Sequence, residues 1–176
     1  MGSVPLVTRL AKHLDLITER IGQAAAWLAL ALVLVTFSVV VLRYLFEIGS
    51  IALQESILYL HASVFLLGAS YTLKVDGHVR VDIFYRHLSN RAKALVNLLG
   101  TVLLLLPVCS FLLWISWDYA ATAWSLREGS SETGGLPYVY LLKSLIPAAA
   151  LLLILQGISQ TLHSLAVIVR TRGEHT

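Results

Sequence analysis

The chain has 176 residues, of which 57% are hydrophobic and only 13% are charged. Soluble domains carry about a quarter charged residues, so this composition excludes an ordinary soluble protein and indicates one integral membrane domain. The net charge of +3 comes from basic residues between apolar runs, which points to lipid headgroups and membrane topology and not to nucleic acid. The single cysteine, Cys109, excludes an internal disulfide and a cysteine metal cluster.

Residues 4–20 predict an amphipathic helix at the membrane surface. Charged residues fall on the faces away from the apolar positions, as an interfacial helix requires. The apolar positions follow helical spacing: Leu6, Leu10, Leu14, Ile17 and Ile21. An ordinary extension of the first spanning helix is the alternative.

Apolar runs along the chain are long enough to span a bilayer, which needs about 20 apolar residues. We expect spans at residues 21–43, 55–73, 94–118 and 144–169. Pro107 lies inside the third span and should kink it or remove one hydrogen bond, which membrane helices tolerate. The predicted fold class is therefore an all-α integral membrane protein with four transmembrane helices and an N-terminal interfacial helix.

One face of the second span carries polar side chains at its start and small side chains near its end. Because a stripe that faces lipid would be apolar, we expect this face to contact other helices. Its residues follow the i+4 and i+3 spacing of one helix face: Gln54, Leu58, His61, Phe65, Gly68 and Thr72.

The distribution of basic residues predicts the orientation. All 13 basic residues except Arg43, Arg127 and Lys143 lie in the N-terminal segment, the loop at 74–93 or the C-terminus. The positive-inside rule places both termini and this loop in the cytoplasm. The Gly/Ser-rich stretch 125–137 then lies in the periplasm, where its composition predicts a flexible exposed loop.

Ionisable residues inside a membrane helix are functional candidates. Glu55 opens the second span, His61 lies two turns deeper, and the fourth span carries Gln156, Gln160 and His163. We interpret His61 as the donor or acceptor of an interhelical hydrogen bond. We interpret Gln156, Gln160 and His163 as groups that hydrogen-bond to neighbouring helices or contact a partner subunit.

The two histidines raise a b-type haem subunit as an alternative function. Counted from the basic ends of their spans, His61 and His163 differ in depth by roughly 9 Å at 1.5 Å per residue, whereas the axial ligands of one haem should be level. The sequence shows no nucleophile–base arrangement, no metal-binding motif and no phosphate loop, so we expect no enzyme and no cofactor. A self-sufficient small carrier also stays an alternative. An ion path needs several polar groups across the bilayer, however, and the spans offer one acidic residue near a helix end.

Four short segments in the second span and the following loop resemble a known family. They are Gln-Glu-Ser at 54–56, Leu-Leu-Gly-Ala at 66–69, Tyr-Thr-Leu-Lys at 71–74 and Asp-Gly-His-Val-Arg-Val-Asp at 76–82. With the predicted topology, the chain is similar from about Leu14 to Arg170 to the small membrane subunit, of the DctQ type, of tripartite ATP-independent periplasmic (TRAP) transporters.

The resemblance implies a role and partners. The small subunit pairs with a large multi-span permease subunit that holds the substrate and sodium sites, and it braces that subunit as it moves. A periplasmic solute-binding protein delivers the solute, usually an organic acid anion, and a sodium gradient drives uptake. The chain would then be a multi-pass protein of a bacterial inner membrane, in contact with membrane lipid.

The resemblance also singles out residues. Many members carry a tryptophan and two adjacent acids at the start of the second span, whereas this chain keeps only Glu55 there. Asp76, His78, Arg80 and Asp82 are expected to fix the turn that joins the second and third spans. The alternative is that these charges only satisfy topology and lipid headgroups, with the acids paired locally.

Overall fold

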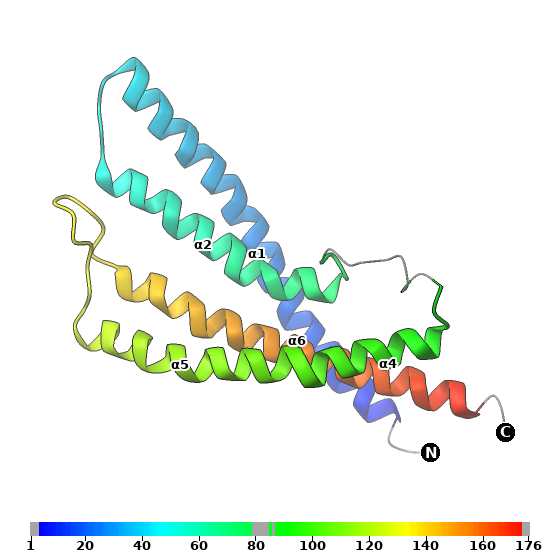
Figure 1. Cartoon of the computed structure of the whole chain (residues 1–176). Coiled ribbons are helices and arrows are strands. Elements are labelled where there is room, and N and C mark those ends of the chain that lie inside the picture. Colours follow the sequence, from blue (N-terminus) through cyan, green and yellow to red (C-terminus); the bar gives the residue numbers. More distant parts are fainter. Residues whose placement is uncertain (1–3, 79–84, 86, 174–176) are drawn as a thin grey trace.

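The structure is a computed structural model that describes residues 4–78, 85 and 87–173 (Figure 1). Helices account for all its regular secondary structure in this part of the chain. The elements are α1 (Val4–Leu45), α2 (Ile51–Lys74), α4 (Asn90–Gly100), the π-helical turn η1 (Thr101–Leu105), α5 (Leu106–Ser125) and α6 (Val139–Gly173). Consecutive residue ranges make α4, η1 and α5 one continuous rod.

Four helices are long and apolar enough to cross a membrane, at Arg9–Leu45, Ile51–Lys74, Asn90–Ser125 and Val139–Val169. They contain the four predicted spans and confirm the all-α class. α1 runs through residue 20 without a break, as the alternative of an extended first span describes. A membrane-surface position for residues 4–20 stays a prediction.

The helices form two hairpins, α1–α2 and α5–α6, that spread apart at one end and converge at the other (Figure 1). We call the converging end, where both termini lie, the terminal end, and the opposite end the loop end. α6 is the central helix, because it packs against α1, α2, α4, η1 and α5.

Small side chains fill the interior, which lets the helix backbones approach closely. The buried residues are Ala11, Ala25, Ala94, Cys109, Ala120, Ala123, Ala149, Ala150 and Leu152, with the polar Thr18, Ser70, Thr101, Ser116, Gln156, Ser159 and Ser164. On α1 the small face packs inward, with Ala11 at 1% and Thr18 at 0% exposure, whereas Leu10 and Ile17 are 54% and 46% exposed. Leu10 and Ile17 of the predicted apolar face therefore point away from the other helices, whereas Leu14 and Ile21 are half-buried.

A π-helical turn accommodates the proline of the third span. Pro107 cannot donate a backbone hydrogen bond, and its ring would clash with the carbonyl of Leu103, four residues earlier. In the structure the helix widens at η1, and the N–H of Leu106 bonds the carbonyl of Thr101 in the wider ring. The predicted disturbance is thus a local π turn, a common way to insert a residue into a helix.

Candidate functional site

A polar cluster joins α1 to α6 near the terminal end. Asp15 Oδ1 accepts a hydrogen bond from Ser159 Oγ at 2.6 Å and another from Gln156 Nε2 at 3.1 Å. Asp15 Oδ2 lies 3.0 Å from His163 Nε2. One carboxylate therefore engages three consecutive turns of the central helix, because positions 156, 159 and 163 lie on one helix face.

Lys74, the last residue of α2, extends this cluster to a third helix. Its Nζ donates to Glu19 Oε2 at 2.8 Å and to the backbone oxygen of Asp15 at 3.1 Å. A cation at a helix C-terminus also interacts favourably with the helix dipole. α1, α2 and α6 are thus tied together by charged and polar side chains at the terminal end.

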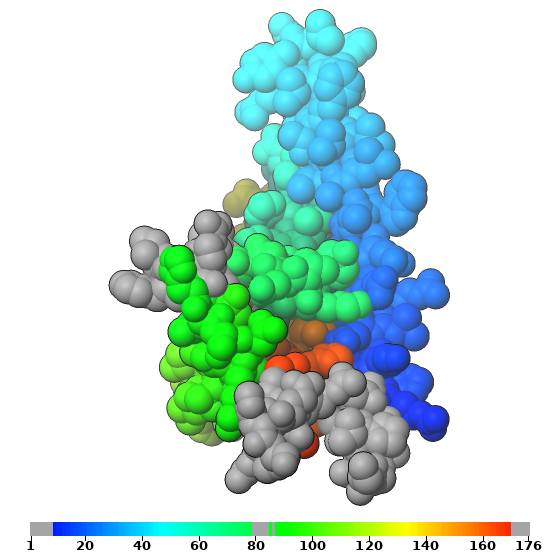
Figure 2. Space-filling view, turned by 90° about the vertical axis from the view of Figure 1, so that its right-hand side faces the viewer, coloured from blue at the N-terminus to red at the C-terminus, as the bar shows by residue number. Residues whose placement is uncertain are grey.

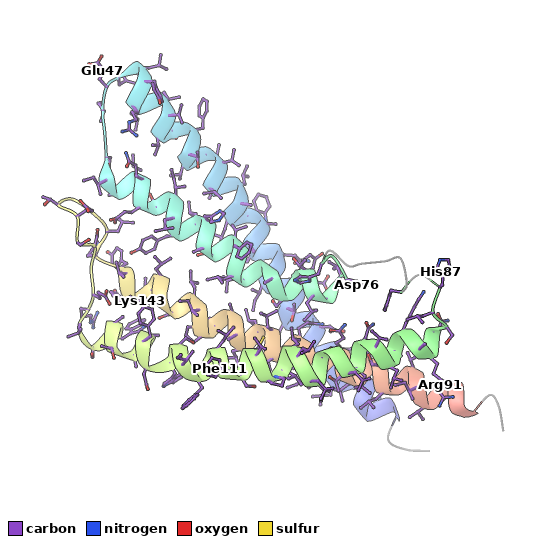
Figure 3. All side chains as sticks on the ribbon, viewed as in Figure 1. Glu47, Asp76, His87, Arg91, Phe111 and Lys143 are labelled. Atoms are coloured by element: carbon purple, nitrogen blue, oxygen red, sulfur yellow. The ribbon has the colours of Figure 1, made fainter. Side chains whose placement is uncertain are left out.

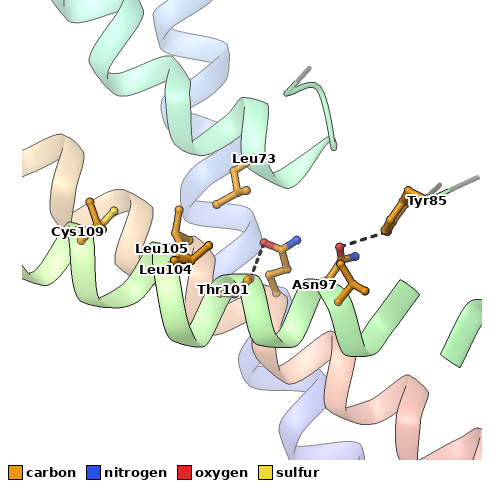
Figure 4. A pocket seen from close by; sticks show the side chains of 11 residues that line it. Leu73, Tyr85, Asn97, Thr101, Leu104, Leu105 and Cys109 are labelled. Atoms are coloured by element: carbon orange, nitrogen blue, oxygen red, sulfur yellow. Dashed lines mark hydrogen bonds between the residues drawn. The ribbon is translucent and has the colours of Figure 1, made fainter. Parts of the chain in front are cut away.

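Gln160 contacts the π turn on the neighbouring rod. Its Oε1 accepts a hydrogen bond from Thr101 Oγ1 at 3.4 Å (Figure 4). Gly157, one turn earlier on α6, lies so close to this rod that an added Cβ would come within 2.8 Å of Leu105 and 3.0 Å of Leu106. A small residue on α6 therefore meets the widened turn of the third span.

A polar cavity opens beside the cluster. It has a volume of about 550 Å³, and its lining includes Asp15, Lys74, Asp76, Lys93 and Asn97. Figure 2 looks at the terminal end and shows α6, in orange, at the floor of a hollow between α1, the end of α2 and α4. The cavity therefore lies among helices that converge on α6.

A second, apolar cavity of about 550 Å³ adjoins the first. Figure 4 shows its lining, which includes Leu104, Leu105 and Cys109 from the π turn and α5. The two cavities share three lining residues, Leu73, Asn97 and Gln160. They therefore adjoin along the space between α2, α4 and α6.

Glu55 makes its contacts at the loop end. Its carboxylate accepts a hydrogen bond from the Ser130 hydroxyl and another from the backbone N–H of Leu136 at 2.6 Å. The Ser130 N–H also bonds the Leu136 carbonyl at 3.0 Å. The composition of residues 125–137 predicts a flexible loop. In the structure these bonds give the loop a defined fold, because the Glu55 carboxylate on α2 accepts from the Ser130 hydroxyl and the Leu136 N–H.

The expected contact face of α2 lies on the outside of this chain. Leu58 and Phe65 are 55% and 70% exposed, and His61 is exposed as well. The ring of His61 stacks on Phe65 of the same helix at 6.4 Å between centroids, and no hydrogen bond of His61 is found in the described part of the chain. Leu58, His61 and Phe65 therefore do not pack on the described helices of this chain, and a contact of this face with helices of a partner subunit stays a prediction.

Asp76 ends α2 in a left-handed backbone conformation, with φ of 57°. Its N–H bonds the carbonyl of Leu73 at 3.3 Å, and the N–H of Gly77 bonds that of Thr72 at 2.9 Å. These two bonds form a Schellman motif, which terminates the helix. Figure 3 shows Asp76 at this end, across from His87 and Arg91, where the chain enters α4.

The other predicted loop residues are placed as follows. His78 is exposed and lines a groove between α1 and α2. Arg80 and Asp82 lie outside the described residues. The role of these loop residues in setting the turn stays a prediction. The structure describes only how α2 ends at Asp76.

The histidines do not converge. His163 pairs with Asp15 on α1, whereas His61 lies on the outer face of α2. Among residues 4–78, 85 and 87–173, no group of three or more His, Cys, Asp or Glu side chains is placed to hold a metal ion.

Sequence reasoning missed Asp15, Lys74 and Ser159 as a linked set. The sequence does carry a signal for Asp15, because small residues at Ala11, Thr18 and Ala25 repeat every seven positions on its side of α1. Such a repeat marks a helix-packing face. The leucine periodicity of the same segment is more conspicuous and indicates the outer face instead.

The chain was compared with known proteins. Residues 32–167 match the family model described as "Tripartite ATP-independent periplasmic transporters, DctQ component". No curated protein and no solved structure matches the chain in the same comparisons. The match covers well over half of the chain and includes α2, the rod from α4 to α5, the last third of α1 and most of α6. The chain therefore belongs to the DctQ family and is the small permease component of a TRAP transporter.

Proposed function

We propose that this subunit braces a large multi-span permease subunit during sodium-driven uptake of an organic acid. A periplasmic solute-binding protein delivers the solute in this proposal, and the chain resides in a bacterial inner membrane. The family match over a four-helix bundle carries the proposal. The polar ties between α1, α2 and α6 support it, because a brace requires helices that keep a fixed arrangement.

The outer face of the α1–α2 hairpin is the proposed contact with the large subunit. A groove of about 600 Å³ runs there, lined by Gly22, Ala26 and Ala29 of α1 and by Phe65 and Gly68 of α2. A Cβ added to Gly68 would meet nothing within 4 Å. Small residues let a second helix approach closely in lipid, where association depends on van der Waals packing.

The proposed orientation follows the basic residues. The terminal end faces the cytoplasm, and the loop held by Glu55 faces the periplasm. A folded loop at that surface lies on the side from which a solute-binding protein approaches.

Co-purification tests the partner contact. Mild extraction from native membranes should yield the chain with a large multi-span protein at equal stoichiometry. Gly68→Trp should fill the groove and remove the partner, whereas Ile115→Trp on the exposed face of α5 should retain it. Retention of the partner by Gly68→Trp, with the variant folded, would place the contact elsewhere.

Reconstitution and spectroscopy test the rival functions. Proteoliposomes with both membrane subunits and the binding protein should take up solute only with a sodium gradient. Uptake by this chain alone would instead establish a self-sufficient carrier. A Soret band from stoichiometric haem would establish a redox subunit.

A further inference from the structure

The two adjoining cavities form one groove with a polar end and an apolar end. We define the α2–α4–α6 groove as the polar cavity at Lys74, Asp76 and Lys93 together with the apolar cavity that runs to Cys109. We propose that this groove binds one zwitterionic phospholipid with a primary-amine headgroup. The phosphate lies at Lys93, the ammonium group lies toward the carboxylates, and one acyl chain lies along the apolar cavity.

The charges of the polar cavity favour a zwitterion. Among the described residues, its lining includes two lysines, Lys74 and Lys93, two aspartates, Asp15 and Asp76, and His163. Lys74 is already engaged with Glu19 and with the backbone of Asp15, so Lys93 is the principal ligand for a phosphate. A headgroup with one anionic and one cationic group matches this balanced lining, whereas a headgroup with only negative charge would be repelled by the carboxylates.

The polar cavity also provides hydrogen-bond groups for the ammonium. Asp15 lines the cavity and its side chain is 20% exposed, so its carboxylate can be reached from the cavity. A carboxylate accepts up to about four hydrogen bonds, and Asp15 has three such contacts, with Ser159, Gln156 and His163. The carboxylate of Asp15 therefore favours a donor-rich cationic group at this end of the groove.

The apolar end has the length of an acyl chain. From Asn97 to Cys109 the rod extends about 18 Å at 1.5 Å per residue. This length is close to half of the ~30 Å hydrocarbon core, the depth that one acyl chain reaches. Leu104, Leu105 and Val108 line this stretch, so a chain that enters from the polar end stays in contact with apolar side chains.

The helix arrangement leaves room for such a ligand. α2 packs on α1 and α6, and α4 packs on η1 and α6, so α6 joins two helices whose facing sides enclose the groove. Gly100 lines it, and a Cβ there would meet nothing within 4 Å. A phospholipid would fill this space and connect α2 to α4.

Native mass spectrometry of the full chain, extracted mildly from bacterial membranes, tests the proposal. The wild-type chain should retain one phosphatidylethanolamine. Gly100→Phe, which fills the apolar end, and Lys93→Gln, which removes the phosphate ligand, should each lower occupancy about tenfold, as expected for loss of a charge-assisted hydrogen bond or an equivalent contact. Matched controls are Gly68→Phe in the other groove and Arg91→Gln, an exposed cation two residues away on another face of α4, and both should retain wild-type occupancy.

Add-back to delipidated protein separates the possible sources of the phosphate. Phosphatidylethanolamine should raise the melting temperature of wild type and not of Gly100→Phe, whereas inorganic phosphate and glycerophosphoethanolamine should have no effect. Equal stabilisation by inorganic phosphate, equal binding of phosphatidylglycerol, or wild-type occupancy in Gly100→Phe would each overturn the proposal. These readouts need no large subunit, so they stand apart from the test of the proposed function.

Discussion

At the scale of single residues, Asp15 contributes the clearest polar link in the protein. It is 20% exposed at its side chain, and Ser159 and Gln156, which donate to it, are 0% and 3% exposed. Buried donors that lose their acceptor cost more than exposed ones, because water cannot replace the lost bond. The link therefore depends more on the buried partners than on His163, whose side chain is about half exposed.

Replacing Asp15 with Ala should destabilise the bundle. We expect a loss of about 1–3 kcal/mol in the free energy of unfolding, since the buried Gln156 amide loses its acceptor and Ser159 keeps only its longer bond, at 3.2 Å, to the Ala11 carbonyl. Thermal unfolding in a mild detergent measures it. Glu19→Ala is the matched control, because it removes a carboxylate one turn away that is 43% exposed at its side chain, and ion pairs of solvent-exposed carboxylates contribute little. Equal effects of the two substitutions would contradict the account.

Glu55 acts between an element and a loop, through acceptors placed at the start of α2. Glu55→Ala should release the loop, so that the amide hydrogens of residues 130–136 exchange faster with solvent. Hydrogen–deuterium exchange with mass spectrometry reports this directly. Glu132→Ala, in the same loop, should leave exchange at the Leu136 amide unchanged, since its side chain does not bond that amide. Unaltered protection in Glu55→Ala would show that the loop is folded without the carboxylate.

At the scale of elements, close packing between α1 and α2 depends on a glycine. A Cβ at Gly22 would overlap the ring of Tyr71, whereas a Cβ at Gly68 would meet nothing within 4 Å. The difference arises because the atoms nearest Gly22 include Cβ and Cγ of Tyr71, which the α2 backbone holds in place.

These two glycines provide a matched pair of substitutions. Gly22→Ala should lower the free energy of unfolding by about 1–3 kcal/mol, as overpacking does. Gly68→Ala should leave it equal or raise it by up to about 1 kcal/mol through helix propensity. Thermal unfolding of the chain without its partner measures both. The packing described for α1 and α2 would be refuted by a Gly22→Ala variant as stable as wild type.

At the scale of the whole molecule, both termini lie at one end and the loop bound by Glu55 at the other (Figure 1). The bundle alone does not distinguish the two orientations, because either end can face the cytoplasm. Most basic residues lie at the terminal end, so the positive-inside rule predicts that this end faces the cytoplasm.

Cysteine labelling tests this orientation. The single native cysteine, Cys109, is 4% exposed, so Cys109→Ala provides a background without thiols. In intact spheroplasts, a maleimide that cannot cross the membrane should label Glu132→Cys and not His87→Cys. After permeabilisation both should react. Labelling of His87→Cys alone in intact cells would invert the topology.

The sequence by itself determined the class, the number of spans and their approximate bounds. Apolar runs of about 20 residues suffice for this, because the bilayer imposes a length that does not depend on packing. The segment Asp76 to Asp82 also carried the family, which the match over residues 32–167 confirmed. Pro107 also predicted a local disturbance in the third span, although the sequence did not predict that this disturbance is a π turn.

Only the tertiary structure decided which faces meet. Leucine and alanine are both compatible with lipid, so apolar periodicity does not tell an outer face from a packed one, and on α1 the small face is the packed one. The pairing of Asp15 with His163 joins positions 148 apart in the chain. Such a contact depends on the crossing of α1 and α6, which no local pattern contains. The same crossing makes α6 the central helix and encloses the groove beside it.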